Sequence, residues 1–582
     1  MLGTLCSSLL VLFASAVVGQ AVFALAGRRG WTPIAPAVGL AVLVALSWAS
    51  VRLPGEGTSA AIVLALAVAG AAALALRDDG PDRAPPLRDG LVVLTALVLA
   101  ALPFLLEGRF GIPGTGLNPD LSQHLFAADR LANAGSERLI EHGYPLGPHS
   151  VVVALSALGL SLVEGFNGLM IATAIAACLT AMAALEGLSA PKRVVGALVV
   201  GFAYLFASSH VQGAFKETLQ ALFLLAFALA LRELVRRGAS SAGGPRALGA
   251  LPLAALAIGS AYVYSFPGLV WLAGTVAVWA ALELADAARR GGAGEAQRLA
   301  RAAAPSALLG LGVLVLVLAP EIGRMANFAS FETFDPRGAG LGNLFNRLSP
   351  LEALGLWPSG DFRVEPGGGA APAAVFLLGG TVGVAALGFG VVWSLRRGER
   401  ALVAALATAA ALWLFTLLGG TPYQESKALV LVAPLVALVC VRALLTGAPG
   451  ILAAGYCLAA AGCAALVLLN GPVGPREYSP ALAELRPELG PGSVLVLAPA
   501  ELLDEQHGRD YLVWELRGNR VCVEALRAVS AFSRPGISTQ VVIAAGDAVE
   551  PEGVLRNRST ASGPGPCPLI PDGARADPAP GD

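Results

Sequence analysis

The sequence predicts an all-α protein that crosses a membrane many times and carries a small extracytoplasmic α/β domain near its C-terminus. Of its 582 residues, 56% are hydrophobic and only 14% are charged, and the mean hydropathy is +0.70. Soluble domains carry about 25% charged residues. Apolar runs long enough to cross a bilayer recur along the chain. Strand-like sequence appears only after the last of these runs.

The apolar runs define the expected spans, because a helix needs about 20 apolar residues to cross a bilayer. Together they predict about fourteen transmembrane helices. The expected ranges are 4–26, 33–52, 57–76, 88–106, 166–187, 195–209, 216–236, 247–263, 267–286, 303–320, 372–395, 400–418, 427–445 and 450–469. A shorter apolar stretch at 149–163 follows the sequence Tyr-Pro-Leu-Gly-Pro-His.

Basic residues in short loops predict the orientation, since such loops lie on the cytoplasmic side. The basic clusters are Arg28-Arg29, Arg77/Arg83/Arg88, Lys192-Arg193, Arg232/Arg236/Arg237/Arg246, Arg289/Arg290/Arg298/Arg301 and Arg396/Arg397/Arg400. They share one side only if the stretch 149–163 does not cross the membrane. We therefore expect a re-entrant or surface-lying helix there, with both termini and the loop 107–148 on the extracytoplasmic side.

These boundaries divide the chain into successive parts. They are N-terminal transmembrane helices (1–106), an extracytoplasmic active loop with the re-entrant helix (107–164), a transmembrane core (165–470) with an outer loop (321–371), an extracytoplasmic α/β domain (471–555) and a tail (556–582). In the α/β domain, Val494 and Val541 open strand-like runs, whereas 480–488 and 522–532 have helix-like sequence. The tail is rich in Pro, Gly and Ser and is predicted to be disordered.

The polar segment from Leu106 to His149 is the candidate active loop. It is the first long polar segment, and it contains signals for a helix start. Asn118 can cap the helix, Pro119 suits its first position, and Asp120 lies in its first turn near the positive end of the dipole. A short helix is therefore expected to begin here and to place Asp120 at its start.

Asp120 is the candidate catalytic residue, because a carboxylate in this loop can act as a general base on an acceptor hydroxyl. The alternative is compensation of the helix dipole, worth roughly a few tenths of a kcal/mol. His124 lies one turn further on the same helix face and could orient a phosphate or sugar, or simply be exposed. His149, in the first turn of the re-entrant helix, would face the same cavity or cap that helix. Asp129 and Arg130 are expected to form a solvated pair.

Two lysines form the second constellation. Of the 39 basic residues only Lys192, Lys216 and Lys427 are lysines. Lys216 and Lys427 each start a predicted span at the outer face, against the positive-inside bias, and each has a carboxylate nearby, Glu217 and Glu425. Either lysine alone could be a snorkelling residue. Two such sites favour a shared anion-binding function, and a lipid-linked phosphate at headgroup level is the natural ligand.

Other polar residues are expected at the same depth. They are His210, Gln212, Tyr264, Tyr423 and Gln424. These could donate hydrogen bonds to a substrate, although for the tyrosines an ordinary role in the interfacial aromatic belt is favoured. Glu321 and Arg324 open the second outer loop, and they either line the same cavity or form a boundary ion pair.

These residues resemble those of the membrane glycosyltransferases of the C superfamily (GT-C fold), which use polyprenyl-phosphate sugars. The motifs are Asp120 within Asn-Pro-Asp-Leu-Ser-Gln-His, the stretch from Tyr144 to His149 that opens the re-entrant helix, and the pair Lys216-Glu217 at the start of a span. The extracytoplasmic α/β domain also fits this family, and the likeness covers roughly residues 88–470.

The resemblance implies a bacterial hexosyl- or pentosyltransferase in the inner (plasma) membrane. Asp120 would be the base of an inverting transfer, and Lys216 or Lys427 would hold the donor phosphate. The expected partners are a polyprenyl-phosphate-linked sugar, a glycan, lipid or protein acceptor, and membrane lipids. Two features depart from the family: three spans precede the one leading into the loop, and the loop lacks an Asp-x-Asp pair. No cofactor is certain, and the sequence leaves a requirement for a divalent metal open.

Other classes of protein are alternatives to a glycosyltransferase. A net charge of −1 gives no reason to expect nucleic-acid binding, and the seven cysteines show no metal-ligand spacing. A transporter or flippase would place its charges near the bilayer midplane, whereas here they fall at span ends. A non-catalytic envelope-assembly protein that had lost its base would have a very similar sequence, so it stands as the third hypothesis.

Overall fold

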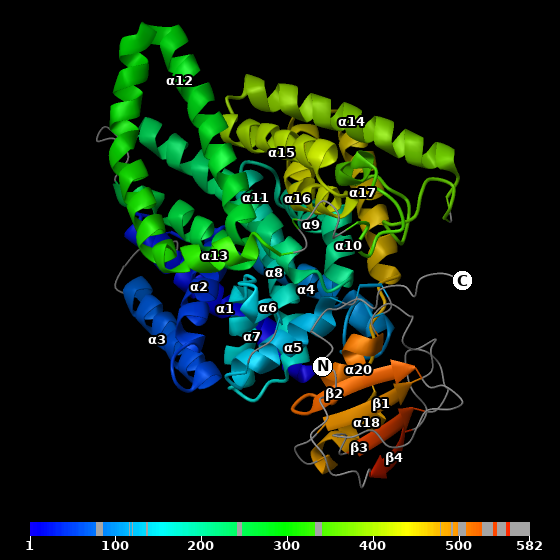
Figure 1. Cartoon of the computed structure of the whole chain (residues 1–582). Helices are drawn as coiled ribbons and strands as arrows, with labels where there is room; N and C mark the ends of the chain where they lie inside the picture. The colour runs from blue at the N-terminus through cyan, green and yellow to red at the C-terminus, as the bar shows by residue number, and fades with distance from the viewer. Residues whose placement is uncertain are drawn as a thin grey trace.

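The computed structural model describes residues 1–28, 30–76, 85–115, 117–118, 120–135, 138–240, 247–331, 334, 340–369, 371–477, 479–489, 493–498, 508–525, 539–543 and 554–558. Within these residues nine helices are long and apolar enough to cross a membrane, or ten if the bent pair α9–α10 forms one span. The chain is therefore a multi-pass membrane protein, and its membrane part is helical as predicted (Figure 1).

The long helices follow the predicted order. They are α1 (Leu2–Leu25), α2 (Ala35–Val51), α3 (Glu56–Leu76), α4 (Leu87–Leu106), α8 (Leu162–Ala184), α9 (Ala190–Gly201), α10 (Tyr204–Val211), α11 (Phe215–Ser240), α12 (Leu251–Leu318), α14 (Ala373–Arg396), α15 (Arg400–Gly419), α16 (Pro422–Gly447) and α17 (Gly450–Leu469). Helices α8 and α16 are the most deeply buried among the candidate spans and form the centre of the bundle. The α1–α2 contact is so close that a Cβ on Gly19 would lie 1.8 Å from the carbonyl oxygen of Ala35.

One region differs from the predicted spans: the expected span 195–209 is broken into α9 and α10, which meet at a bend of 56°. The three expected spans 247–263, 267–286 and 303–320 follow one another within α12. Non-helical backbone at Ser265 and at Gly291–Gly292 separates them, inside the two gaps that the sequence predicts. Gly292 has φ +69°, a conformation that glycine adopts without strain, so the chain reverses there into the long hairpin of Figure 1.

The stretch 149–163 forms no full span. Its helix, α7 (Gly147–Ser156), has 10 residues, which is about 15 Å of helix and half the thickness of a bilayer core. Residues 147–155 are all buried. α7 is thus an interior half-helix, and it packs against α2, α3, α5 (Asp120–Ala132) and α8.

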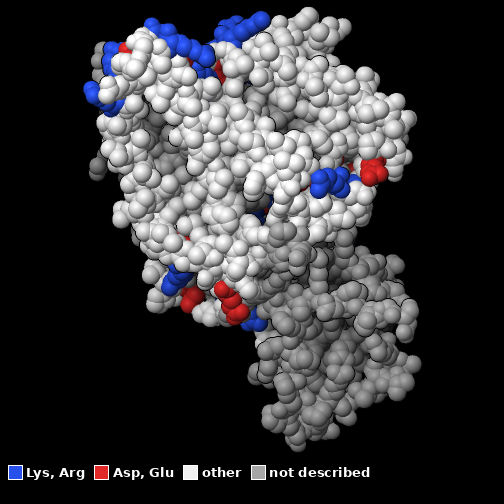
Figure 2. Space-filling model, turned by 45° about the horizontal axis from the view of Figure 1, so that its top comes forward, with Lys and Arg blue, Asp and Glu red and all other residues white. Residues whose placement is uncertain are grey.

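The basic segments meet at one end of the bundle. Their ion pairs are Arg28–Glu233 at 3.4 Å, Arg232–Glu399, Arg442–Glu399 and Arg400–Glu283 at 2.8 Å. Figure 2 shows Lys and Arg side chains gathered along the upper edge of the molecule. Lys216 lies at the opposite end of α11 from Arg232, about 24 Å away along the helix axis.

The C-terminal part contains a four-stranded sheet of order β2-β1-β3-β4. Its elements are α18 (Pro480–Leu485), β1 (Ser493–Ala498), α20 (Gly508–Glu515), β2 (Arg520–Ala525), β3 (Thr539–Ile543) and β4 (Val554–Arg558). β1 is parallel to β2 and β3, whereas β4 is antiparallel to β3. The prediction of a helix from 522 was wrong, because residues 522–525 belong to β2; 526–532 lie outside the described residues. The expected tail likewise begins inside β4, and 559–582 are not described.

Candidate active site

The predicted helix in the polar loop exists and begins at Asp120. Helix α5 is capped by Asn118, whose Oδ1 accepts a hydrogen bond from the backbone N–H of Asp120 at 3.1 Å. Pro119 lies outside the described residues. The Asp120 Oδ2 atom accepts a hydrogen bond from the Tyr423 hydroxyl at 3.2 Å. Tyr423 lies in the first turn of α16, so a residue expected in the aromatic belt instead orients the candidate base.

Lys427 lies one turn beyond Tyr423 on α16, with its Nζ 4.3 Å from the centroid of the Tyr423 ring. The same Nζ forms an ion pair with Glu217 Oε1 at 3.1 Å. Glu217 is also hydrogen-bonded to the hydroxyl of Tyr264, the second tyrosine expected in the belt. A chain of polar contacts therefore leads from Asp120 through Tyr423 and Lys427 to Glu217.

Lys216 is buried beside this chain, with 8% of its surface exposed, and so it does not snorkel. Its Nζ lies 3.9 Å from the centroid of the Tyr144 ring. Among the described residues, no carboxylate oxygen forms an ion pair with Lys216. Asp120 lies within electrostatic reach of both Lys216 and Lys427. Lys216 is thus a buried cation whose closest partner is an aromatic face.

We call this group of residues the Asp120 cluster. Its members are Asp120, Tyr144, Lys216, Glu217, Tyr264, Tyr423 and Lys427. Its two ammonium groups and two carboxylates balance each other, so a phosphate could bind only by competing with a carboxylate or by occupying the unpaired face of Lys216. From the sequence, Tyr264 and Tyr423 were possible hydrogen-bond donors for which the aromatic belt was favoured, and Tyr144 belonged only to the turn before the re-entrant helix. Their rarity was the available signal, since the chain has only eight.

His124 and His149 form a buried pair behind Lys216. His149 Nε2 and His124 Nδ1 are 3.1 Å apart, within hydrogen-bonding distance. The Phe215 ring, next to Lys216 in sequence, lies 4.9 Å from the His124 ring. Burial lowers the pKa of His149 to about 3 and the pKa of His124 well below its usual range, so both rings are neutral at pH 7. The two histidines therefore form a neutral aromatic surface and supply no cation for a phosphate.

This pair predicts an acid-sensitive fold. Because the folded-state pKa values are depressed, the unfolded chain takes up protons first as the pH falls below about 6.5. Each histidine should then remove up to about 1.4 kcal/mol of stability per pH unit, while the loss is absent above pH 7. We expect the melting temperature in detergent to fall from pH 7 to pH 4.5. The fall should be shallower in His124→Asn/His149→Gln, which keeps a side-chain hydrogen bond at this position.

The exposed His142 provides the matched control. The variant His142→Gln should retain the steep wild-type dependence of melting temperature on pH. Equal slopes for the wild type and the double variant would assign the acid sensitivity to other groups.

Two other predicted site residues lie apart from the Asp120 cluster. His210 Nε2 is 2.9 Å from the carbonyl oxygen of Ala100, which anchors α10 to α4. Glu321 pairs with Arg324 at 2.7 Å and with Arg52 at 2.6 Å. Of the two interpretations of Glu321, the structure favours the boundary ion pair.

Gln424 and Glu425 also have structural partners. Gln424 and Thr421 form a reciprocal capping box at the start of α16. Glu425 Oε1 accepts a hydrogen bond from the Trp413 indole at 3.2 Å, and its Oε2 pairs with Arg347, also at 3.2 Å. Both residues thus fix the end of the helix that presents Tyr423 and Lys427.

The expected solvated pair Asp129–Arg130 does not form. Asp129 Oδ1 lies 3.7 Å from Arg517 Nε beside α20, and the Arg130 guanidinium lies over the Phe126 ring. Partial burial raises the pKa of Asp129 above its usual value, against the opposing effect of Arg517. The C-terminal part thus braces the helix that begins with Asp120.

The described residues contain no group of three or more His, Cys, Asp or Glu side chains that could hold a metal ion. No model of a known protein family matches the chain, and a search of curated proteins also finds no match. The case for a function therefore depends on the geometry of the Asp120 cluster.

Proposed function

We propose that this protein is an integral-membrane glycosyltransferase. It would move a sugar from a polyprenyl-phosphate donor to a hydroxyl group of an envelope glycan, lipid or protein. One observation carries the proposal: Asp120, Lys216 and Lys427, which come from three different helices, lie in one cluster. Such a transfer requires a base for the acceptor and cationic stabilisation of the leaving phosphate, and these residues offer both.

The contacts suggest how the step would proceed. Tyr423 occupies Oδ2 of Asp120, so Oδ1 is the oxygen proposed to take the proton from the acceptor hydroxyl. The acceptor oxygen then forms a bond to the anomeric carbon. The bond between that carbon and the phosphate oxygen breaks, and its electron pair leaves with the polyprenyl phosphate. Among the described residues, Lys216 forms no ion pair with a carboxylate. Its ammonium group would therefore stabilise the negative charge of this leaving group.

We place the active site on the extracytoplasmic face of the inner membrane. The joined basic segments at the far end of α11 support this orientation, because such segments lie on the cytoplasmic side. The same orientation supports about fourteen spans. It also supports an extracytoplasmic C-terminal domain, because Arg517 of that domain contacts Asp129 on α5.

A transporter or flippase is favoured less. Lys216 and Glu217 are the second and third residues of α11, and Lys427 lies in the second turn of α16. These charges are near helix ends, whereas transporters usually bind their substrates near the bilayer midplane. No specific contact favours a non-catalytic role, and an activity measurement separates it from the enzyme.

The test uses purified full-length protein in lipid nanodiscs. Undecaprenyl phosphate should raise the melting temperature, and undecaprenol, which lacks the phosphate, should not. A ligand at 100 times its Kd stabilises a protein by about 2.7 kcal/mol. A panel of hexosyl and pentosyl undecaprenyl phosphates should then release undecaprenyl phosphate in the presence of membrane extract. Equal shifts with the phosphate and the alcohol, or no release from any member of the panel, would refute the proposal.

A further inference from the structure

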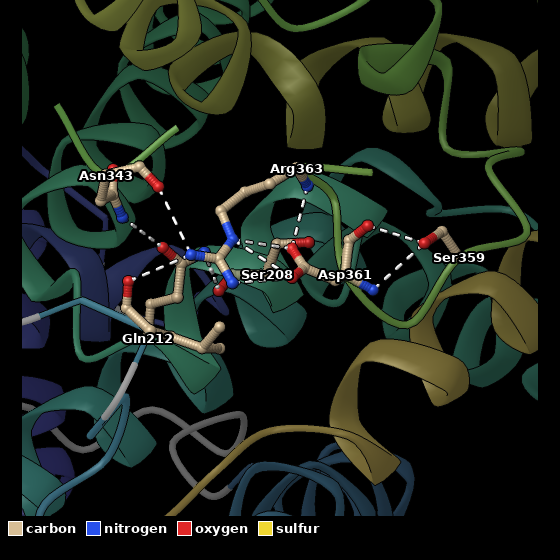
Figure 3. A network of polar contacts seen from close by, with 7 residues as sticks. Ser208, Gln212, Asn343, Ser359, Asp361 and Arg363 are labelled. Atoms are coloured by element: carbon tan, nitrogen blue, oxygen red, sulfur yellow. Dashed lines mark hydrogen bonds and ion pairs between the residues drawn. The ribbon is translucent and has the colours of Figure 1, made fainter. Parts of the chain in front are cut away.

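The segment 340–363 contributes Asn343, Ser359, Asp361 and Arg363 to a polar network with Ser208 and Gln212 (Figure 3). Arg363 lies at its centre with only 6% of its surface exposed. The guanidinium forms a two-pronged ion pair with Asp361, with Nε–Oδ1 at 3.0 Å and Nη2–Oδ2 at 2.8 Å. It also stacks on the Phe345 ring, 4.1 Å from the centroid. These contacts use the planar fork of arginine, which lysine cannot reproduce.

The third guanidinium nitrogen of Arg363, Nη1, connects separate parts of the chain. Nη1 donates to the carbonyl oxygens of Leu117 and Asn343, each at 3.4 Å. Leu117 immediately precedes Asn118, the residue that caps α5. The Asn343 side chain in turn donates to Gln212 Oε1 at 3.0 Å. Arg363 thus ties the approach to α5 to the segment 340–363 and to the end of α10.

The other end of this segment contacts Tyr423. The Gly340 carbonyl oxygen accepts a hydrogen bond from the Tyr423 backbone N–H at 3.4 Å. Gly342 has φ +60°, and a Cβ there would lie 2.5 Å from Tyr423 Cδ2. Only glycine allows this close approach to the ring. One segment therefore contacts both the approach to Asp120 and the tyrosine that orients Asp120.

We propose that Arg363 is a positioning residue. It holds the segment 340–363, which we call the template, in place between α5 and Tyr423. The template in turn keeps Asp120 in position for proton transfer. The inference rests on the proposed function. Arg363 makes no contact with Asp120 among the interactions of the described residues, so it acts through Leu117 and the template. A shift of about 1 Å in a reacting group can cost about 100-fold in rate. Loosening the template should therefore lower kcat without weakening donor binding.

The test is Arg363→Lys, which keeps the charge but loses the fork. We expect kcat for sugar transfer to fall about 100-fold, with KM for the donor changing less than about threefold. Amide hydrogen exchange measured without substrate should become faster in residues 112–132 and stay unchanged in α8, because the start of α5 is released. Arg52→Lys, the same change in an arginine paired with Glu321, should alter neither measurement.

A second variant addresses the template from its other end. Gly342→Ala should also lower kcat selectively, because the added methyl displaces the Tyr423 ring. Unchanged kcat in both folded variants would overturn the inference, as would unchanged exchange in residues 112–132 of Arg363→Lys. No release of undecaprenyl phosphate from any donor by the wild-type protein would instead refute the proposed function. Since exchange needs no turnover, the two failures are distinguishable.

Discussion

Asp120→Asn should abolish sugar transfer while the protein stays folded and still binds undecaprenyl phosphate. Asparagine has the size of aspartate, and its Oδ1 can accept the hydrogen bond that Tyr423 now donates to Asp120 Oδ2. It cannot take a proton from the acceptor. General-base catalysis contributes about 10²–10⁴-fold, so we expect the initial rate to fall by at least about 100-fold. Rates with saturating donor, the melting temperature and the shift caused by undecaprenyl phosphate would be measured together.

Asp129→Asn provides the matched control for this change. It makes the same substitution on the same helix, but Asp129 faces Arg517 and lies outside the Asp120 cluster. Its transfer rate should stay within about threefold of the wild type, because asparagine keeps a side-chain oxygen that can accept a hydrogen bond from Arg517. A wild-type rate in Asp120→Asn would remove Asp120 from the mechanism. Loss of undecaprenyl phosphate binding in that variant would give Asp120 a binding role instead.

The features that could be predicted depend on local sequence. The residues that predict the start of α5, Asn118 and Asp120, lie within three positions of the sequence, and the capping hydrogen bond between them is present. The apolar runs predict the helical membrane part because length and hydropathy are properties of one segment. The sequence predicts a shared anion-binding function for Lys216 and Lys427, and the structure brings both lysines within electrostatic reach of Asp120.

The remaining features depend on packing between distant segments. Tyr423 and Asp120 are separated by 303 residues, and a tyrosine at a helix end is equally typical of an aromatic belt. The sequence suggests that His124 could orient a substrate. Its partner His149 lies on a different helix, so only the packing of the two helices shows that the two rings bury each other.

The ion pair between Glu217 and Lys427 should give opposite changes in stability and in phosphate binding. The two side chains are 9% and 20% exposed and 3.1 Å apart. Removing one partner of a buried pair leaves an uncompensated charge, which costs about 3 kcal/mol. Glu217→Gln should therefore lower the melting temperature of the free protein. It should also enlarge the shift caused by undecaprenyl phosphate, because the phosphate no longer competes with a carboxylate for Lys427.

Lys427→Met should lower the melting temperature as well, but it should reduce the shift caused by undecaprenyl phosphate, because only Lys216 then remains to bind the phosphate. The double variant Glu217→Gln/Lys427→Met removes both charges, so its loss of stability should be smaller than the sum of the single losses. Its shift should nevertheless stay reduced, because the phosphate has lost one of its two cations. This combination separates a phosphate site from a purely structural ion pair. If the ion pair were purely structural, undecaprenyl phosphate would cause the same shift in the wild type, both single variants and the double variant. Such uniform shifts would assign Lys427 to folding alone and leave Lys216 as the only cation proposed to bind the donor.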